Sequence, residues 1–244
     1  MNNVILILRH VCDISSLNAW ILCYRSVKHH YPHTAVIAID TGSIQPLIDT
    51  SGTDQCQVIY AQHPQNRLFA PLYEFITNDC CKLYDRAIII HDGIIFQSTI
   101  DFSCIPNSRF IWHFVQHDWD NSQLETYMIK TLTNNEELLD IYNGKKWHGC
   151  LGGMLVISRS CAHAINSKYS LLRLHQLINN QTDAIAYERV IAVLCYAQCP
   201  DIELNVSLEG DISGMPWGYR CEEYLADPEK YKHARILKLF GART

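Results

Sequence analysis

Short, uninterrupted apolar runs separated by helical patterns constrain this chain most. The runs NVILIL at 3–8, TAVIAI at 34–39 and RAIII at 86–90 show no alternation of polar and apolar residues. A strand buried on both faces has this pattern, and such strands are typical of parallel sheets covered by helices. QVIY at 57–60 adds a shorter strand between the second and third runs. The sequence therefore predicts an α/β fold with a mixed, mostly parallel sheet flanked by helices.

Four segments have the spacing or composition of helices. Between the first two runs, apolar residues recur at 17, 20, 21, 24 and 27, after candidate N-caps at 13–16, and Pro32 ends the helix. The segment 68–84 predicts a second helix, and 170–178 and 182–199 predict two more in the second half of the chain.

Size and charge narrow the possible functions. The 244 residues fit one α/β domain. The net charge of −5 has the wrong sign for the basic surface of a nucleic-acid-binding protein, so no nucleic acid partner is expected. Apolar residues make up 48% and charged residues 18%, which predicts a packed core rather than a disordered chain.

The sequence carries no visible export or membrane signal. Its apolar runs are far shorter than the ~20 residues of a membrane-spanning helix. Residues 1–3 lack the basic segment of a signal peptide. We therefore expect a cytoplasmic protein whose 11 cysteines stay reduced. No C-x-x-C pair is present, so a structural zinc site is not expected.

Ligands of open α/β sheets bind beyond the carboxyl ends of the strands. The chain has neither a G-x-G-x-x-G motif nor a P-loop motif, which argues against a dinucleotide site or a P-loop ATP site. The predicted strand ends are Arg9-His10, Asp40-Thr41, the segment 63–67 and His91-Asp92.

Three short segments resemble GT-A glycosyltransferases. The segment YDRAIIIHDG at 84–93 resembles the strand that carries that family's metal-binding D-x-D motif, with His91-Asp92-Gly93 in the motif's place. The segments 147–154 (WHGCLGGM) and 188–192 (ERVIA) resemble the acceptor-side strand and the helix that follows it. The tail at 236–243 resembles a Lys-aromatic-Gly-Arg ending. The H-D version resembles GT-A-like proteins encoded by large DNA viruses and algae.

The resemblance implies a function and a division of the chain. It implies a glycosyltransferase that moves a hexosyl or pentosyl group from a UDP- or GDP-linked sugar to a hydroxyl of a glycan or glycoprotein acceptor. It also implies a single GT-A-like domain over 1–244, with a nucleotide-binding half at 1–100 and an acceptor half at 101–244 that ends in a closing segment. Mn²⁺ or Mg²⁺ is the implied cofactor.

The altered motif bears directly on the metal. Asp92, with His91, is the candidate for binding metal and diphosphate. A single carboxylate holds Mg²⁺ or Mn²⁺ weakly unless the diphosphate supplies further ligands, and imidazole suits Mn²⁺ better than Mg²⁺. The activity could also be independent of metal, or absent, which leaves a non-catalytic nucleotide-sugar binding module as an alternative.

The resemblance also implies roles for residues outside the altered motif. Glu188 is the candidate catalytic carboxylate, with Asp183 as its fallback; alternatively, Glu188 and Arg189 form a surface pair. Gly152 and Gly153 would allow an acceptor close to the backbone, with Trp147 as a stacking wall, or they form a tight turn. The remaining candidates for nucleotide-sugar binding are Arg9, His10, Asp40, Arg67 and Lys238. Alternatively, these are ordinary turn residues, polar residues hydrogen-bonded within the protein, or solvated surface residues.

Two further features suggest other chemistry. Asp118-Trp119-Asp120 is a literal D-x-D, but it does not follow a buried strand, so we expect a polar aromatic loop or an acceptor contact. Cys150 beside His148 is the candidate nucleophile of a Cys-dependent hydrolase or transferase, the remaining alternative function.

Overall fold

A six-stranded sheet forms the centre of the molecule. The computed structural model describes residues 2–49, 52–53, 55–214 and 219–240; the expected tail residues 241–243 lie outside these ranges. In spatial order, the strands of the sheet are β3 (Gln57–Tyr60), β2 (Ala35–Asp40), β1 (Asn3–Arg9), β4 (Arg86–His91), β9 (Leu155–Ser158) and β6 (Ser108–Phe110).

The pairing of the strands confirms the predicted fold class. β1 pairs in parallel with both β2 and β4, and β2 pairs in parallel with β3. β9 runs antiparallel to β4 and to β6, so the sheet is mixed but mainly parallel.

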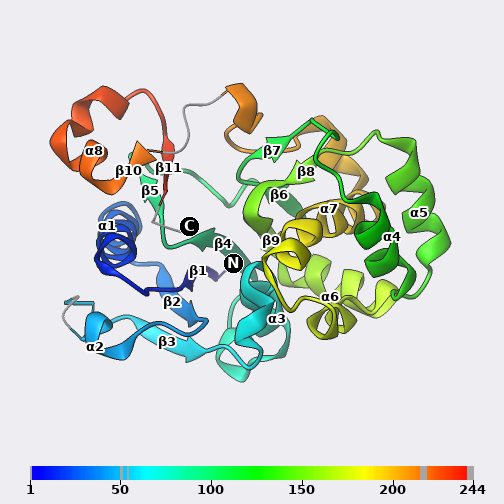
Figure 1. Ribbon diagram of the computed structural model, residues 1–244, viewed down its shortest axis with the longest axis horizontal. Helices are drawn as coiled ribbons and strands as arrows, with labels where there is room; N and C mark the ends of the chain where they lie inside the picture. Colours follow the sequence, from blue (N-terminus) through cyan, green and yellow to red (C-terminus); the bar gives the residue numbers. More distant parts are fainter. Residues whose placement is uncertain (1, 50–51, 54, 215–218, 241–244) are drawn as a thin grey trace.

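The sheet is buried on both faces, which explains the uninterrupted apolar runs. In β1, Val4, Leu6 and Leu8 face the larger hydrophobic core, whereas Ile5 and Ile7 face a second core on the opposite side. Helix α1 (Ile14–His30) packs on the side of the second core. Helices α3 (Ala70–Thr77), α6 (Arg159–Tyr169) and α7 (Gln181–Gln198) pack into the larger one (Figure 1).

Two of the predicted helices differ from the structure. The helix expected at 68–84 is α3 flanked by 3-10 turns, because α3 ends where Asn78 becomes extended and its side chain accepts from the backbone N–H of Cys80. The segment 170–178 is a 3-10 turn that begins after Ser170, whose left-handed backbone (φ 58°) interrupts the helical path. The helix predicted at 182–199 is α7, shifted by one residue to Gln181–Gln198.

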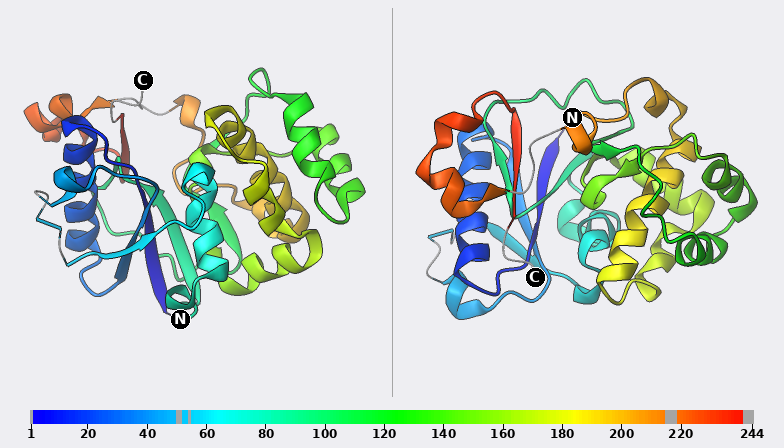
Figure 2. Two further views of the ribbon diagram at one scale, coloured as in Figure 1. Left: turned by 60° about the horizontal axis from the view of Figure 1, so that its bottom comes forward. Right: turned by 45° about the horizontal axis from the view of Figure 1, so that its top comes forward.

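Shorter elements that the sequence did not predict enclose one side of the larger core. Helices α4 (Ser122–Lys130) and α5 (Asn135–Gly144) pack against α7, on the far side of the molecule from α1 (Figures 1 and 2). Further short elements are β7 (His113–Phe114), α2 (Gln45–Ile48) and α8 (Cys221–Ala226). Strand β8 (Gly149–Cys150) lies in the segment 147–154 that resembles an acceptor-side strand.

The C-terminal part of the described chain returns to the end of β4. Strand β11 (Ile236–Phe240) pairs antiparallel with β5 (Ile94–Phe96), and β10 (Tyr219–Arg220) pairs with β11. The N–H of Leu239 donates to the carbonyl of Gly93 over 2.7 Å, and a Cβ at Gly93 would lie 2.7 Å from the carbonyl oxygen of Leu239. This close approach requires glycine and brings Lys238 beside the end of β4.

No helix among the described residues is both long enough and apolar enough to cross a membrane.

Candidate functional site

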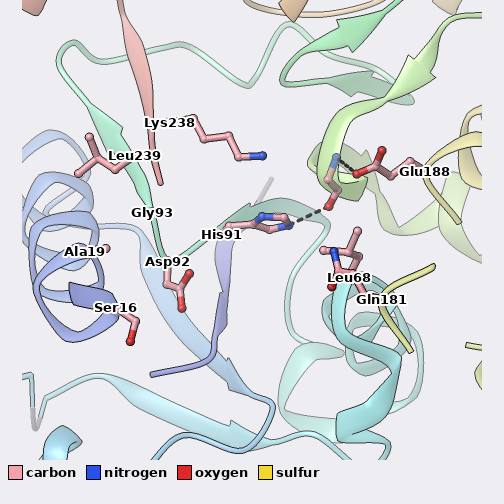
Figure 3. A pocket seen from close by; sticks show the side chains of 11 residues that line it. Ser16, Ala19, Leu68, His91, Asp92, Gly93, Gln181, Glu188, Lys238 and Leu239 are labelled. Carbon is pink, nitrogen blue, oxygen red and sulfur yellow. Dashed lines mark hydrogen bonds between the residues drawn. The ribbon is translucent and has the colours of Figure 1, made fainter. Parts of the chain in front are cut away.

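A pocket of about 210 Å³ lies beyond the carboxyl end of β4 (Figure 3). Its walls come from the start of α1, the end of β4, the turn after β8, the first part of α7, and β11. This is the position at which open α/β sheets bind ligands. The polar side chains that line it are Ser16, His91, Asp92, Gln181, Glu188 and Lys238.

One glycine connects two of the candidate residues. The Nε2 atom of His91 lies 2.8 Å from the carbonyl oxygen of Gly152, and the N–H of Gly152 donates to Oε1 of Glu188 over 2.8 Å. Because a carbonyl only accepts hydrogen bonds, His91 carries its proton on Nε2 when the ring is neutral. The end of β4 and the middle of α7 are thus fixed relative to each other through Gly152.

Gly152 and Gly153 meet a strict backbone requirement. Their φ angles are 64° and 63°, in the left-handed region that favours glycine. A Cβ at Gly152 would lie 2.7 Å from Cε1 of His91, and one at Gly153 would lie 2.9 Å from a ring carbon of Tyr187. Gly152 lines the pocket, and its left-handed backbone makes the tight turn that the sequence allowed.

Asp92 faces the pocket from the opposite side to Glu188 (Figure 3). Its side chain is 6% exposed, and Oδ2 accepts the backbone N–H of His10 over 2.8 Å. This hydrogen bond ties the end of β4 to the residue that follows β1. The ring of His10 donates from Nδ1 to the carbonyl of Thr41 over 3.1 Å, so its Nε2 is the acceptor of the neutral ring.

Glu188 is a carboxylate in a largely buried setting. Its side chain is 12% exposed, and Oε2 accepts from the Arg189 guanidinium over 3.0 Å. Burial raises the pKa of Glu188 above its ordinary value of 4.5, against the opposing effect of the positive charges of Arg189 and Lys238. Figure 3 shows the Lys238 side chain extending from β11 toward the Glu188 side of the pocket.

The structure places Arg9 and Asp40 in a buried ion pair beside the site. Arg9 Nε lies 2.6 Å from Asp40 Oδ2, and the two side chains are 2% and 3% exposed. Asp40 Oδ1 accepts the backbone N–H groups of Gly42 and Ser43. Burial opposes ionisation, but these hydrogen bonds and that of Arg9 together hold the pKa of Asp40 below its ordinary value of 3.8. Neither residue lines the pocket, so this pair is a structural support of the strand ends.

Three other candidates also lie outside the pocket lining. Asp183 caps α7, because its Oδ2 accepts the backbone N–H groups of Asn179 and Asn180. Arg67 is exposed, has a φ of 43°, and donates to the pocket-lining Gln181 over 3.1 Å. Trp147 is fully buried and donates to the carbonyl of Tyr142, so the expected stacking wall is wrong: its ring has no exposed face to offer an acceptor.

Cys150 does not have the environment of a nucleophile. Its side chain is fully buried, and the thiol lies 3.5 Å from the carbonyl of Met154. Burial raises the pKa of Cys150 well above its ordinary value, so the thiol stays protonated at neutral pH. The geometry therefore does not support the Cys-dependent alternative.

The alternative interpretation of Glu188 and Arg189 as a surface pair is wrong, because both side chains are largely buried. Arg189 is 3% exposed and lies among buried carboxylates contributed by α4 and by the loop before it. Asp120 belongs to this group, which accounts for the literal D-x-D: Asp118 and Trp119 are exposed, whereas the Asp120 side chain is 2% exposed. No local pattern indicates this burial, because α4 and Arg189 are far apart in the chain.

The donor set limits how a divalent ion could be held. No group of three or more His, Cys, Asp or Glu side chains within the described parts of the chain could hold a metal ion. Since Nε2 of His91 donates to Gly152, only Nδ1 could ligate. Asp92 is the carboxylate of the β4 end, so these residues fit an ion that also binds a ligand's phosphate oxygens, not one caged by protein alone.

Sequence reasoning missed Ser16, Ala19, Leu68, Gln181 and Leu239, which also line the pocket. Gln181 could have been found, because the Asn180–Asp183 capping box fixes it as the first residue of α7. The others carry no chemical signal in the sequence and enter the lining through packing.

Comparisons with known proteins add one likeness of fold. No family model and no curated protein matches this chain. Among solved structures, it is similar to the galactosyltransferase LgtC in complex with donor and acceptor sugar analogs. The two share 10% sequence identity at a TM-score of 0.47, over 99% of this chain and 88% of that one. A likeness of this degree does not assign the chain to a family.

Proposed function

We propose that the pocket binds a nucleoside-diphosphate sugar, UDP- or GDP-linked, and that the protein transfers the sugar to a hydroxyl of a glycan or glycoprotein acceptor. One observation carries the proposal. A carboxylate directly after β4 (Asp92), an ammonium from β11 (Lys238) and a buried carboxylate from α7 (Glu188) line a single pocket at the carboxyl end of a mainly parallel sheet.

The Asp92 side of the pocket suits a diphosphate leaving group. Negative charge develops on the diphosphate as the bond to the sugar breaks, and a fixed positive charge stabilises it. Lys238, which extends from β11 across the pocket toward Glu188 (Figure 3), would supply such a charge between the Asp92 side and the Glu188 side. If Mn²⁺ or Mg²⁺ takes part, Asp92 would hold it together with the phosphate oxygens, and the ion would add charge neutralisation there.

The Glu188 side of the pocket suits an acceptor hydroxyl. Each carboxylate oxygen of Glu188 accepts one hydrogen bond from the protein, which leaves a lone pair on each for a proton. A general base works best when its pKa lies near the operating pH, and burial shifts the pKa of Glu188 in that direction. Glu188 would thus take the acceptor's proton while Gly152 keeps its side chain in place.

Thermal unfolding with UDP- and GDP-sugars, each with and without Mn²⁺, tests the binding claim. A ligand at 100 times its Kd stabilises a protein by about 2.7 kcal/mol. We expect stabilisation by at least one nucleotide sugar, with an Mn²⁺-dependent part that is lost in Asp92→Asn. Asp101→Asn is the matched control, because Asp101 lines a different cavity, near Asn3 at the start of β1. No stabilisation by any nucleotide sugar would refute the proposal, and stabilisation without turnover would indicate a binding module.

A further inference from the structure

A buried network of charges lies directly behind Glu188. Arg189 stands at its centre: its NH1 donates to Glu188 over 3.0 Å, and its Nε donates to Asp120 Oδ1 over 3.3 Å. The same Nε lies 3.6 Å from Oε1 of Glu125. The side chains of Arg189, Asp120 and Glu125 are between 1% and 4% exposed, so solvent screens these contacts weakly.

The guanidinium is fixed on several sides. It lies over the ring of Phe114 at 4.3 Å, and its NH1 also donates to the carbonyl of Ile185 over 3.2 Å. A planar guanidinium makes several directed hydrogen bonds at once, which an ammonium cannot do in the same way. Arg189 therefore has one orientation, and that orientation directs NH1 at Glu188.

Asp120 is held as firmly as Arg189. Its Oδ2 accepts from Lys145 over 2.6 Å and from His117 over 2.9 Å, while Oδ1 accepts from Arg189. Glu125 is held by the hydroxyl of Tyr142 and by the backbone N–H of Asn121. The loop before α4 and the helix itself thus form a rigid support for Arg189.

We propose that Arg189 is a positioning residue for Glu188, and that Asp120 anchors Arg189 in that role. The proposal rests on the proposed function, in which Glu188 takes the acceptor's proton. Arg189 contacts Glu188 from behind and does not line the pocket, so it acts through Glu188 and not on substrate. The literal D-x-D of the sequence then serves the carboxylate side of the site rather than a metal.

The network supplies the charge that a buried base needs. Burial alone favours the protonated form of Glu188, and a protonated carboxyl cannot accept a proton from a hydroxyl. The groups that face Glu188 are Arg189 on its own helix, Lys238 on β11, the Gly152 N–H, and the neutral thiol of Cys150 at the end of β8. Arg189 donates to Glu188 over 3.0 Å, and its positive charge opposes the effect of burial more than the other groups do, so it contributes most to keeping Glu188 ionised.

The test measures the ionisation of Glu188 itself. Protein labelled with ¹³C at the glutamate side-chain carboxyls is titrated by NMR, with the Glu188 signal assigned by its absence in Glu188→Gln. Removing an opposite charge at this distance raises a carboxyl pKa by about 1–3 units. We expect that rise in Arg189→Gln, and a smaller rise in Arg189→Lys, which keeps the charge but not the directed hydrogen bonds of the guanidinium. Asp118→Asn, in the same loop but exposed, should leave the pKa of Glu188 unchanged.

A double variant keeps the test usable if Arg189→Gln does not fold. Arg189→Gln leaves Asp120 and Glu125 buried without their cation, so Arg189→Gln/Asp120→Asn, which removes one charge of each sign, is titrated as well. An unchanged Glu188 pKa in whichever of the two folds would overturn the proposal.

Kinetics separate this inference from the proposed function. With a nucleotide sugar that is turned over, kcat is measured as a function of pH. Arg189→Gln should lower kcat and move the acid limb of the kcat–pH profile to higher pH, with the donor KM unchanged. If the Glu188 pKa rises as expected but no sugar is transferred by wild type, the coupling stands and the proposed function fails. If transfer occurs but the acid limb does not move, Arg189 is not a positioning residue.

Discussion

Gly152 donates its backbone N–H to the Oε1 atom of Glu188 at 2.8 Å, although 36 positions separate the two residues. The carbonyl of the same glycine accepts from His91, so the turn after β8 holds α7 and the end of β4 together. This connection sets Glu188 opposite Asp92 across one pocket. The two carboxylates can then serve different parts of a substrate.

Loss of the Glu188 carboxylate should abolish most activity. Glu188→Gln removes the proton acceptor, and general-base catalysis is typically worth ~10²–10⁴-fold, so kcat should fall by that factor while the donor KM changes little. The amide has only one oxygen for two donors, Gly152 and Arg189, so stability should also fall by about 1–3 kcal/mol. Steady-state kinetics measure the fall in kcat. Urea unfolding followed by near-ultraviolet circular dichroism measures the fall in stability. Glu222→Gln, on the exposed face of α8, is the control, and equal losses in the two variants would contradict the role.

Lys238 should contribute to donor binding through charge. A hydrogen bond to a charged group contributes about 1.5–3 kcal/mol, so Lys238→Gln should weaken nucleotide-sugar binding by roughly 10- to 100-fold. Isothermal titration calorimetry with the donor and with the matching nucleoside checks this. The nucleoside, which lacks phosphates, should bind both proteins equally. Lys232→Gln, outside this pocket and 68% exposed, should bind the donor like wild type, and an unaltered affinity in Lys238→Gln would rule out the phosphate contact.

Gly152→Ala should lower the free energy of unfolding by more than the strain of its left-handed backbone alone explains. A non-glycine residue in the left-handed region costs about 1–2 kcal/mol. At Gly152 the added Cβ would also lie 2.7 Å from His91, and such overpacking typically costs ~1–3 kcal/mol more. Gly52→Ala is a matched control, because Gly52 has the same φ of 64° with no atom within 4 Å of the added Cβ. Urea unfolding compares the two, and equal losses would show that the contact with His91 carries no strain.

The Arg9–Asp40 pair should support the fold without binding substrate. Asp40→Asn leaves the buried Arg9 without its anion, and breaking such a pair costs about 3–5 kcal/mol. Folding lowers the pKa of Asp40 below its ordinary value of 3.8. The ionised carboxylate therefore stabilises the fold above pH 3.8, and this stabilisation is lost as the pH falls through the pKa of the folded protein. Stability in urea at neutral and at acidic pH should therefore differ less in Asp40→Asn than in wild type. A variant whose stability and acid dependence both match wild type would contradict this.

Local patterns in the sequence predicted the parts of the fold that depend on local burial. The doubly buried strands are uninterrupted apolar runs because β1 places alternate residues in two different cores, and α7 follows its helical spacing. The rule for strand ends also pointed to the position of Asp92 directly after β4, since it depends only on where a parallel strand stops.

Contacts between distant segments could not be predicted in this way. Asp40 ends a strand like Asp92, but the register that pairs Arg9 with Asp40 commits it to an ion pair. Trp147 beside glycines suggested an exposed ring, yet α5 covers it through Tyr142. Arg189 next to Glu188 suggested a surface pair, and only the packing of α4 against α7 buries it.

Release of nucleoside diphosphate is the most direct test of the proposed function. Purified protein is incubated with a panel of UDP- and GDP-sugars and Mn²⁺, with simple sugars as acceptors, and the products are followed by ³¹P NMR. The account predicts that at least one donor yields nucleoside diphosphate and glycosylated acceptor, and that Glu188→Gln slows both together. A protein that binds none of these donors and releases no nucleoside diphosphate from them would contradict it.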